Sequence, residues 1–145
     1  MPLAGNGDGL RPQVEVTYAP LASTFSRSVD YQFTNGLKVY LSGDTGLHAD
    51  MKTIVSEFHK ANLAVLNLGP NAVTGFSAAY AVNELLKPAA VIASHVNEGA
   101  TTGGKVRADS RTAAFMSLVK GRPVFLALSG KTMEFDGNAK CVAGC

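Results

Sequence analysis

Alternating apolar and polar residues predict β-structure in the first third of the chain. The alternation covers residues 14–18, 29–33 and 37–41, and Asn35 and Gly36 separate the last two runs. Asn-Gly between two alternating runs is a strong hairpin signal, because both residues tolerate positive φ angles. We therefore expect three strands at the start of the fold, the last two joined as a hairpin.

The spacing of apolar residues changes to three and four after residue 46, which is typical of an amphipathic helix. The first helix should end near Ala61 and Asn62, since asparagine tolerates the left-handed conformation of a helix C-cap. Pro88 and Gly121 are end signals for two further helices. The three predicted helices cover about residues 47–61, 77–87 and 109–120.

Two short apolar runs, at residues 63–68 and 89–93, lack alternation and predict strands that are buried on both faces. Residues 123–128 and 132–135 predict the closing strands. This order indicates an α/β fold in which several strands share one set of helices. The sheet face away from the helices then needs cover from a partner chain or from residues outside this sequence.

Composition narrows the class of protein. The 145 residues suit one domain, 46% are hydrophobic, 17% are charged and the formal net charge is +2. The basic residues are scattered, so nothing resembles a nucleic-acid-binding surface. No apolar run is long enough to span a membrane, and no basic-apolar leader begins the chain. We expect a soluble protein without a signal peptide; the sequence does not identify its compartment.

The two cysteines, Cys141 and Cys145, stand four positions apart near the C-terminus. A zinc site there would need two more ligands, and no histidine or further cysteine is near. Composition favours two tail thiols without a role in the fold. A disulfide is the alternative, favoured if the protein is exported and the tail turns tightly.

Two candidate functional residues follow predicted strands. Asp44 comes just after the strand that ends at Ser42, and His95 comes just after the strand that ends at Ala93. In open α/β layers, functional groups gather beyond the carboxyl ends of strands. A carboxylate and an imidazole brought together there are suitable ligands for zinc.

Each candidate also has a structural interpretation. Asp44 could cap the first helix, because aspartate is a favoured N-cap residue. His95 could be a strand-end histidine that bonds to the backbone. Two other histidines, His48 and His59, are predicted to be solvated on the first helix.

Several segments resemble a known family. The segment at residues 36–47, which contains Gly-Asp-Thr-Gly, is followed by Asp50-Met51. Leu-Asn-Leu-Gly-Pro-Asn occupies residues 66–71, Ala-Tyr-Ala-Val-Asn-Glu-Leu-Leu-Lys-Pro residues 79–88, and Val-Ile-Ala-Ser-His residues 91–95. In this order they resemble metallo-β-lactamase-fold hydrolases, especially the branch that includes ascorbate-phosphate lactonase. The resemblance covers about residues 14–135.

The resemblance implies an α/β fold, the C-terminal half of an αββα metallo-β-lactamase sandwich, with a mixed sheet and helices on one face. We accordingly divide the chain into a flexible arm at residues 1–12, a half domain at residues 13–136 and a tail at residues 137–145.

The resemblance also implies roles for the two candidates: Asp44 would bridge two metal ions, presumed zinc by their ligand chemistry, and His95 would bind one of them. The family's His-x-His-x-Asp-His cluster is absent, and residues 1–43 contain no histidine. A single copy therefore lacks ligands for the full centre. A second copy or a complementary N-terminal half would complete it for metal-assisted hydrolysis of a small lactone, ester, amide or phosphoester.

Two other functions remain to be weighed. A non-catalytic or partner-dependent binding module derived from the same fold would hold weak metal or none, as the missing ligands suggest. Asp-Thr-Gly, at residues 44–46, is also the triplet of aspartic proteases, but those are rich in β-structure and the three predicted helices argue against them.

Overall fold

The computed structural model describes residues 15–18, 28–69, 75–96 and 99–145. Its strands are β1 (Glu15–Tyr18), β2 (Val29–Gln32), β3 (Lys38–Leu41), β4 (Leu63–Asn67), β5 (Ala90–Ser94), β6 (Thr101–Thr102), β7 (Lys105–Val106), β8 (Val124–Leu126), β9 (Glu134–Phe135) and β10 (Cys141–Ala143). Its helices are η1 (Met51–Phe58), α1 (Gly75–Tyr80), η2 (Ala81–Leu86) and α2 (Arg111–Leu118). The predicted arm, residues 1–12, lies outside the described residues.

The main sheet has the order β1-β2-β3-β4-β5-β8. Strands β1, β2 and β3 pair antiparallel with one another, whereas β3, β4, β5 and β8 pair in parallel. The predicted hairpin joins β2 to β3, and Gly36 in its turn has a φ of 95°. The prediction of a mixed α/β sheet is confirmed.

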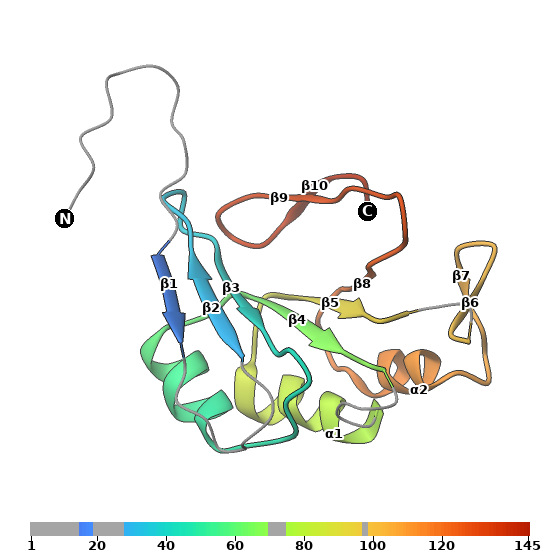
Figure 1. Ribbon diagram of the computed structural model, residues 1–145, viewed down its shortest axis with the longest axis horizontal. Coiled ribbons are helices and arrows are strands. Elements are labelled where there is room, and N and C mark those ends of the chain that lie inside the picture. The colour runs from blue at the N-terminus through green and yellow to red at the C-terminus, as the bar shows by residue number, and fades with distance from the viewer. Residues whose placement is uncertain (1–14, 19–27, 70–74, 97–98) are drawn as a thin grey trace.

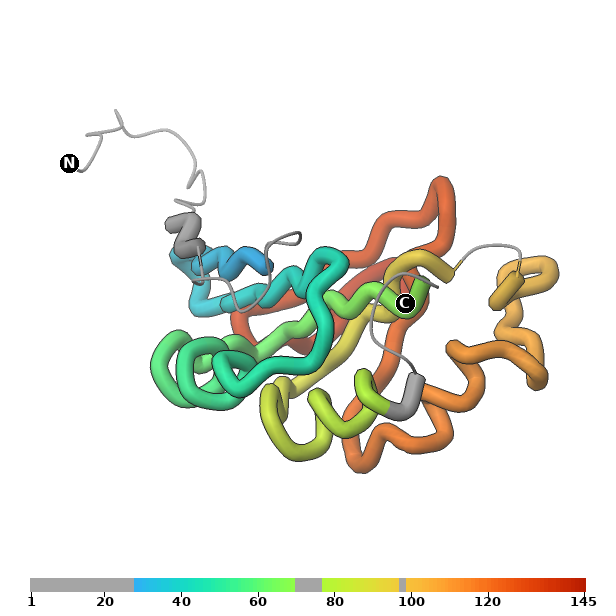
Figure 2. Tube along the Cα trace, turned by 60° about the horizontal axis from the view of Figure 1, so that its bottom comes forward, coloured from blue at the N-terminus to red at the C-terminus, as the bar shows by residue number. Residues whose placement is uncertain are grey.

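The helices cover one face of this sheet, as predicted (Figures 1 and 2). Their apolar residues meet alternate residues of the strands in one core. Its largest fully buried side chains are Tyr40, Phe115, Met51, Leu66, Val55, Val82 and Val91. None of the helices in the described segments is long and apolar enough to cross a membrane.

The opposite face has a smaller core, and the chain itself supplies part of its cover. The β9–β10 hairpin lies over this face (Figure 1), and Phe135 packs edge-to-face on Phe125 of β8 with ring centroids 5.4 Å apart. Val39 and Ile92 in the same cluster remain only half-buried. The chain's own C-terminal residues therefore cover part of this face, and the expected cover from outside the chain stays a prediction.

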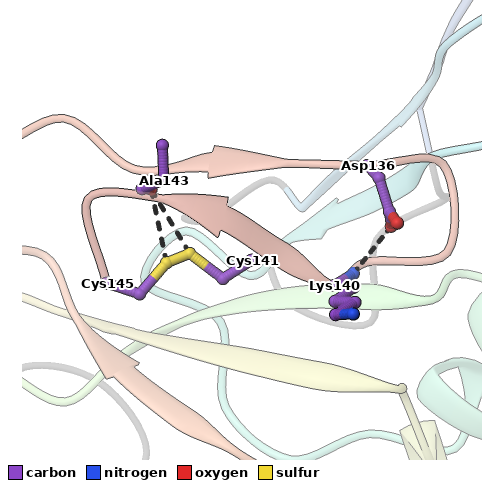
Figure 3. The surroundings of a disulfide bond; sticks show 5 residues. All are labelled: Asp136, Lys140, Cys141, Ala143 and Cys145. Atoms are coloured by element: carbon purple, nitrogen blue, oxygen red, sulfur yellow. Dashed lines mark hydrogen bonds between the residues drawn. A yellow bond between two sulfur atoms is a disulfide. The ribbon is translucent and has the colours of Figure 1, made fainter.

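The prediction of two unpaired tail thiols is wrong, because Cys141 and Cys145 form a disulfide (Figure 3). Their Cα atoms are 6.4 Å apart, within the range that a disulfide spans. The reason is local: β10 pairs with β9, and Gly144, with a φ of 76°, turns the last residues back. Strand β10 thus occupies part of the predicted tail.

The first helix ends earlier than predicted. It stops at Phe58, and Lys60 rather than Asn62 takes the left-handed conformation, with a φ of 57°. Asn62 instead joins three segments: its Oδ1 accepts from the Lys38 backbone at 2.9 Å, and its Nδ2 donates to the Gly137 carbonyl at 2.9 Å.

Two histidines and one aspartate near η1 are ionisable residues that are partly or largely buried. His48 and His59, predicted to be solvated, are half-buried. Burial lowers the pKa of His48, partly offset by Asp50. His59 and Asp30 of β2 line a small surface pocket together, and the two carboxylate oxygens of Asp30 are buried without a hydrogen-bond partner in the described segments. Burial raises the pKa of Asp30, and the nearby His59 offsets this in part.

We expect Asn62→Ala to lower the free energy of unfolding by about 1–3 kcal/mol, because two backbone groups lose their partners. The control is Asn138→Ala, which changes an exposed asparagine next to Gly137. Urea unfolding followed by circular dichroism measures both. An equal, small effect of the two substitutions would show that Asn62 does not tie these segments together.

Asp30 should make the protein less stable as the pH rises. A carboxyl whose pKa is raised by folding contributes stability that is complete below its unfolded value of 3.8 and is lost as the pH passes its folded pKa. We expect Asp30→Asn to have little effect at pH 3.5 and to stabilise the protein at pH 7. Exposed Glu134→Gln is the control, and a wild-type stability that does not fall relative to Asp30→Asn between these pH values would contradict the burial argument.

Candidate metal centre at the carboxyl edge of the sheet

Three parallel strands end at one edge of the sheet. In the register, Leu41 of β3 pairs with Val65 of β4, and Asn67 of β4 pairs with Ser94 of β5. The pairing continues past the strands, since the Ser42 backbone donates to the Val65 carbonyl at 3.0 Å. The loops that carry Asp44 and His95 therefore leave the sheet at the same edge, as predicted.

Asn67 is the residue that links this edge internally. It is 5% exposed, and its Nδ2 donates a hydrogen bond to Oδ1 of Asp44. Its Oδ1 accepts from the Gly69 backbone at 2.7 Å, and its own backbone N–H donates to Oγ of Ser42 at 3.1 Å. The amide of Asn67 is thus held at both ends and fixes one oxygen of the Asp44 carboxylate.

The structure decides between the two interpretations of Asp44. The N-cap residue of η1 is Asp50, and it makes no side-chain capping bond. Asp44 lies further upstream, and its carboxylate bonds to Asn67 instead. Its side chain is exposed. The capping interpretation is therefore wrong, and the carboxylate faces the edge of the sheet.

His95 has a left-handed backbone, with a φ of 59°. This conformation is uncommon for a residue other than glycine and costs about 1–2 kcal/mol. The side chain is exposed, and within the described segments no hydrogen bond of its imidazole to the backbone is found. A strained residue at a strand end is typical of functional sites.

Gly69 lies beside both Asn67 and His95. A Cβ atom at this position would be 2.9 Å from Oδ1 of Asn67 and 3.4 Å from the Cβ of His95. Only glycine fits there without a shift of the Asn67 amide, which in turn holds Asp44. Asn67, the hydrogen-bond partner of Asp44, and His95 therefore border the same residue.

The donor set fits a metal ion only in part. A carboxylate oxygen and an imidazole nitrogen are suitable ligands for zinc, but a zinc site has at least three protein ligands. The described segments contain no group of three or more histidine, cysteine, aspartate or glutamate residues that could hold a metal ion. Asp44 and His95 can contribute to a centre without forming one alone, and their roles as ligands stay predictions.

Sequence reasoning missed the part that Asn67 plays. The sequence feature that could have indicated this role is the single amide side chain, Asn67, near the end of the apolar run 63–68. A buried polar side chain needs a partner, but the sequence does not show that Asp44 would provide it.

Comparison with known proteins identifies similar proteins but does not bear on the site residues. No protein-family model matches the chain. A UPF0173 metal-dependent hydrolase of Polynucleobacter asymbioticus is 35% identical over 107 residues, which are 72% of this chain and 35% of that protein. Another, from Natranaerobius thermophilus, is 43% identical over 63 residues, or 43% of this chain and 28% of that protein. The chain spans about a third or less of the length of these curated relatives.

Solved structures share the fold. Igni18, a metallo hydrolase from the archaeon Ignicoccus hospitalis, has a TM-score of 0.56 at 22% identity, over 86% of this chain and 57% of that protein. A metallo-β-lactamase-superfamily protein of Thermotoga maritima has a TM-score of 0.53 at 16% identity, over 80% of this chain and 69% of that protein. The chain is thus a relative of the UPF0173 metal-dependent hydrolases, with the fold of the metallo-β-lactamase superfamily.

Proposed function

We propose that this chain provides two ligands, Asp44 and His95, to the metal centre of a metal-dependent hydrolase. The observation that carries the proposal is the contact of Asn67 with Asp44 at the edge where His95 also leaves the sheet. The names of the curated relatives support metal-dependent hydrolysis. The proposal joins that activity to particular residues of this chain.

Each residue at the edge has a distinct task. Asn67 holds Oδ1 of Asp44, which leaves the other carboxylate oxygen for a cation. His95 follows β5 with a left-handed backbone, and from this position its imidazole would bind the metal ion. The proposed metal is zinc, as one or two ions, which when bound would act as a Lewis acid and acidify a water molecule.

The remaining ligands must come from elsewhere, and a complementary N-terminal half or a second copy of the chain would supply them. The short span of the chain relative to its relatives supports this. So does the second face of the sheet, where Val39 and Ile92 are only half-buried. We propose a small lactone, ester, amide or phosphoester as the substrate.

A second candidate function is a non-catalytic or partner-dependent binding module of the same fold. It is favoured by the number of suitable ligands, since the described segments contain no group of three or more histidine, cysteine, aspartate or glutamate residues that could hold a metal ion. Such a module would bind metal weakly and would gain no hydrolytic activity when a complementary half is added.

Zinc binding tests the two ligands directly. We expect the isolated chain to retain less than one zinc per molecule after dialysis, because two ligands hold the ion weakly. In a calorimetric titration, Asp44→Asn and His95→Asn should each weaken zinc binding at least tenfold, because each removes a ligand atom. Asparagine is chosen at position 95 because it tolerates the left-handed backbone but lacks the imidazole. His59→Asn is the control at the other end of η1. Unchanged affinity in both edge variants, or a loss only in His59→Asn, would refute the assignment.

Asn67 should act through Asp44. We expect Asn67→Ala to weaken zinc binding about 10- to 100-fold, the usual effect of removing a residue that orients a ligand. Asn83→Ala is a matched control, because its side chain also makes two hydrogen bonds, to Leu118 and Lys120, away from the edge. Both variants should lose stability, but only the first should lose affinity. Equal zinc affinities in the two variants would show that Asn67 does not orient Asp44 for zinc binding.

A further inference from the structure

A third side chain, Arg111, reaches the edge that carries Asp44 and His95. It is the first residue of α2, and its Nη1 donates a hydrogen bond to the Gly69 carbonyl at 2.8 Å. Gly69 is the residue that borders both Asn67 and His95. The guanidinium therefore contacts Gly69, which itself lies beside the proposed metal ligand His95.

Hydrogen bonds of Ser110 fix the start of α2 and with it the backbone position of Arg111. Ser110 is the N-cap, and its Oγ accepts a hydrogen bond from the Ala113 backbone at 3.1 Å. The same hydroxyl donates to the Arg107 carbonyl at 2.6 Å. These bonds hold the first turn of the helix and the backbone from which Arg111 extends.

The charge of Arg111 is not neutralised by its acidic neighbour. Asp109 is bound by Arg107 instead, with Nε to Oδ1 at 3.3 Å and Nη2 to Oδ2 at 3.1 Å. The hydrogen bond from Arg107 is the main reason why the pKa of Asp109 is lowered. Within the described segments Arg111 forms no ion pair, and its partner is a neutral carbonyl.

The chemistry of an exposed guanidinium indicates what it would bind. Arginine has five N–H donors in a planar fork that matches the oxygens of a carboxylate or a phosphate. The bond to Gly69 uses a donor of Nη1 and leaves the others for a ligand. The side chain is exposed, so these donors are open to solvent and to a substrate at the edge.

We propose that Arg111 determines substrate specificity at this site by binding a carboxylate or phosphate group of the substrate. The inference rests on the proposed function, which it narrows from any small lactone, ester, amide or phosphoester to an anionic one. The anionic group would lie against Arg111, and the bond to be hydrolysed would lie toward Asp44 and His95. Neutral substrates would lack this anchor.

Anion titrations of the metal-free chain test the proposal. With chelator present, inorganic phosphate and acetate are added separately, and the amide signals of Gly69, His95 and Ala113 are followed by ¹H–¹⁵N NMR. We expect saturable shifts with at least one of the two anions. Arg111→Gln should raise that dissociation constant at least tenfold. Arg122→Gln is the control, because Arg122 likewise donates to backbone carbonyls, those of Pro88 and Lys120, and it should change the constant less than twofold.

A conservative variant separates anion binding from a structural role. Arg111→Lys keeps the positive charge and should retain weakened phosphate binding, with a thermal unfolding midpoint close to that of Arg111→Gln. Saturation by phosphate alone or by acetate alone identifies the anionic group. Shifts that do not saturate with either anion, or equal losses in Arg111→Gln and Arg122→Gln, would overturn the proposal.

The test is independent of the metal ligands because no zinc is present. If zinc binding fails in the earlier titration but the anion still binds through Arg111, the ligand roles of Asp44 and His95 are wrong and the anion site stands. If zinc binds through the two ligands but no anion binds, the specificity proposal alone is wrong.

Discussion

The parallel pairing of β3, β4 and β5 is the constraint on which the candidate site depends. Hydrogen bonds between parallel strands set their register, so their carboxyl ends fall at the same edge. Asp44 and His95 are far apart in the sequence, and their loops leave the sheet at the same edge only because each follows one of these strands. A strand between them, β4, contributes the asparagine that bonds to Asp44. The site is thus a product of sheet register rather than of any local motif.

The two faces of the sheet contribute differently to this arrangement. The helix-covered face contains the main core, which holds the strands in place. The other face is covered in part by the β9–β10 hairpin, and the disulfide of Cys141 and Cys145 closes the last five residues of the chain into a loop. Half-buried apolar residues remain beside the hairpin, where further chain would find a ready surface.

Much of the fold could be predicted from the sequence, because it depends on local patterns. Asn35-Gly36 predicted the β2–β3 hairpin, and the apolar runs predicted β4 and β5. The strand-end rule placed Asp44 and His95 at one edge. What escaped prediction depends on contacts between distant segments: the bond from Asn67 to Asp44, the reach of Arg111 to Gly69, and the role of Asn62, which left Lys60 to end the first helix. The disulfide escaped because it requires the pairing of β10 with β9, two strands of two or three residues.

Diffraction from a crystal of this chain soaked with zinc, recorded at the zinc absorption edge, tests the central claim most directly. The account predicts an anomalous peak about 2.0–2.2 Å from both an Asp44 carboxylate oxygen and a His95 ring nitrogen, the usual zinc–ligand distances. A zinc peak bound by His48 or His59 with none at the carboxyl edge, or one that touches His95 while Asp44 points elsewhere, would contradict it.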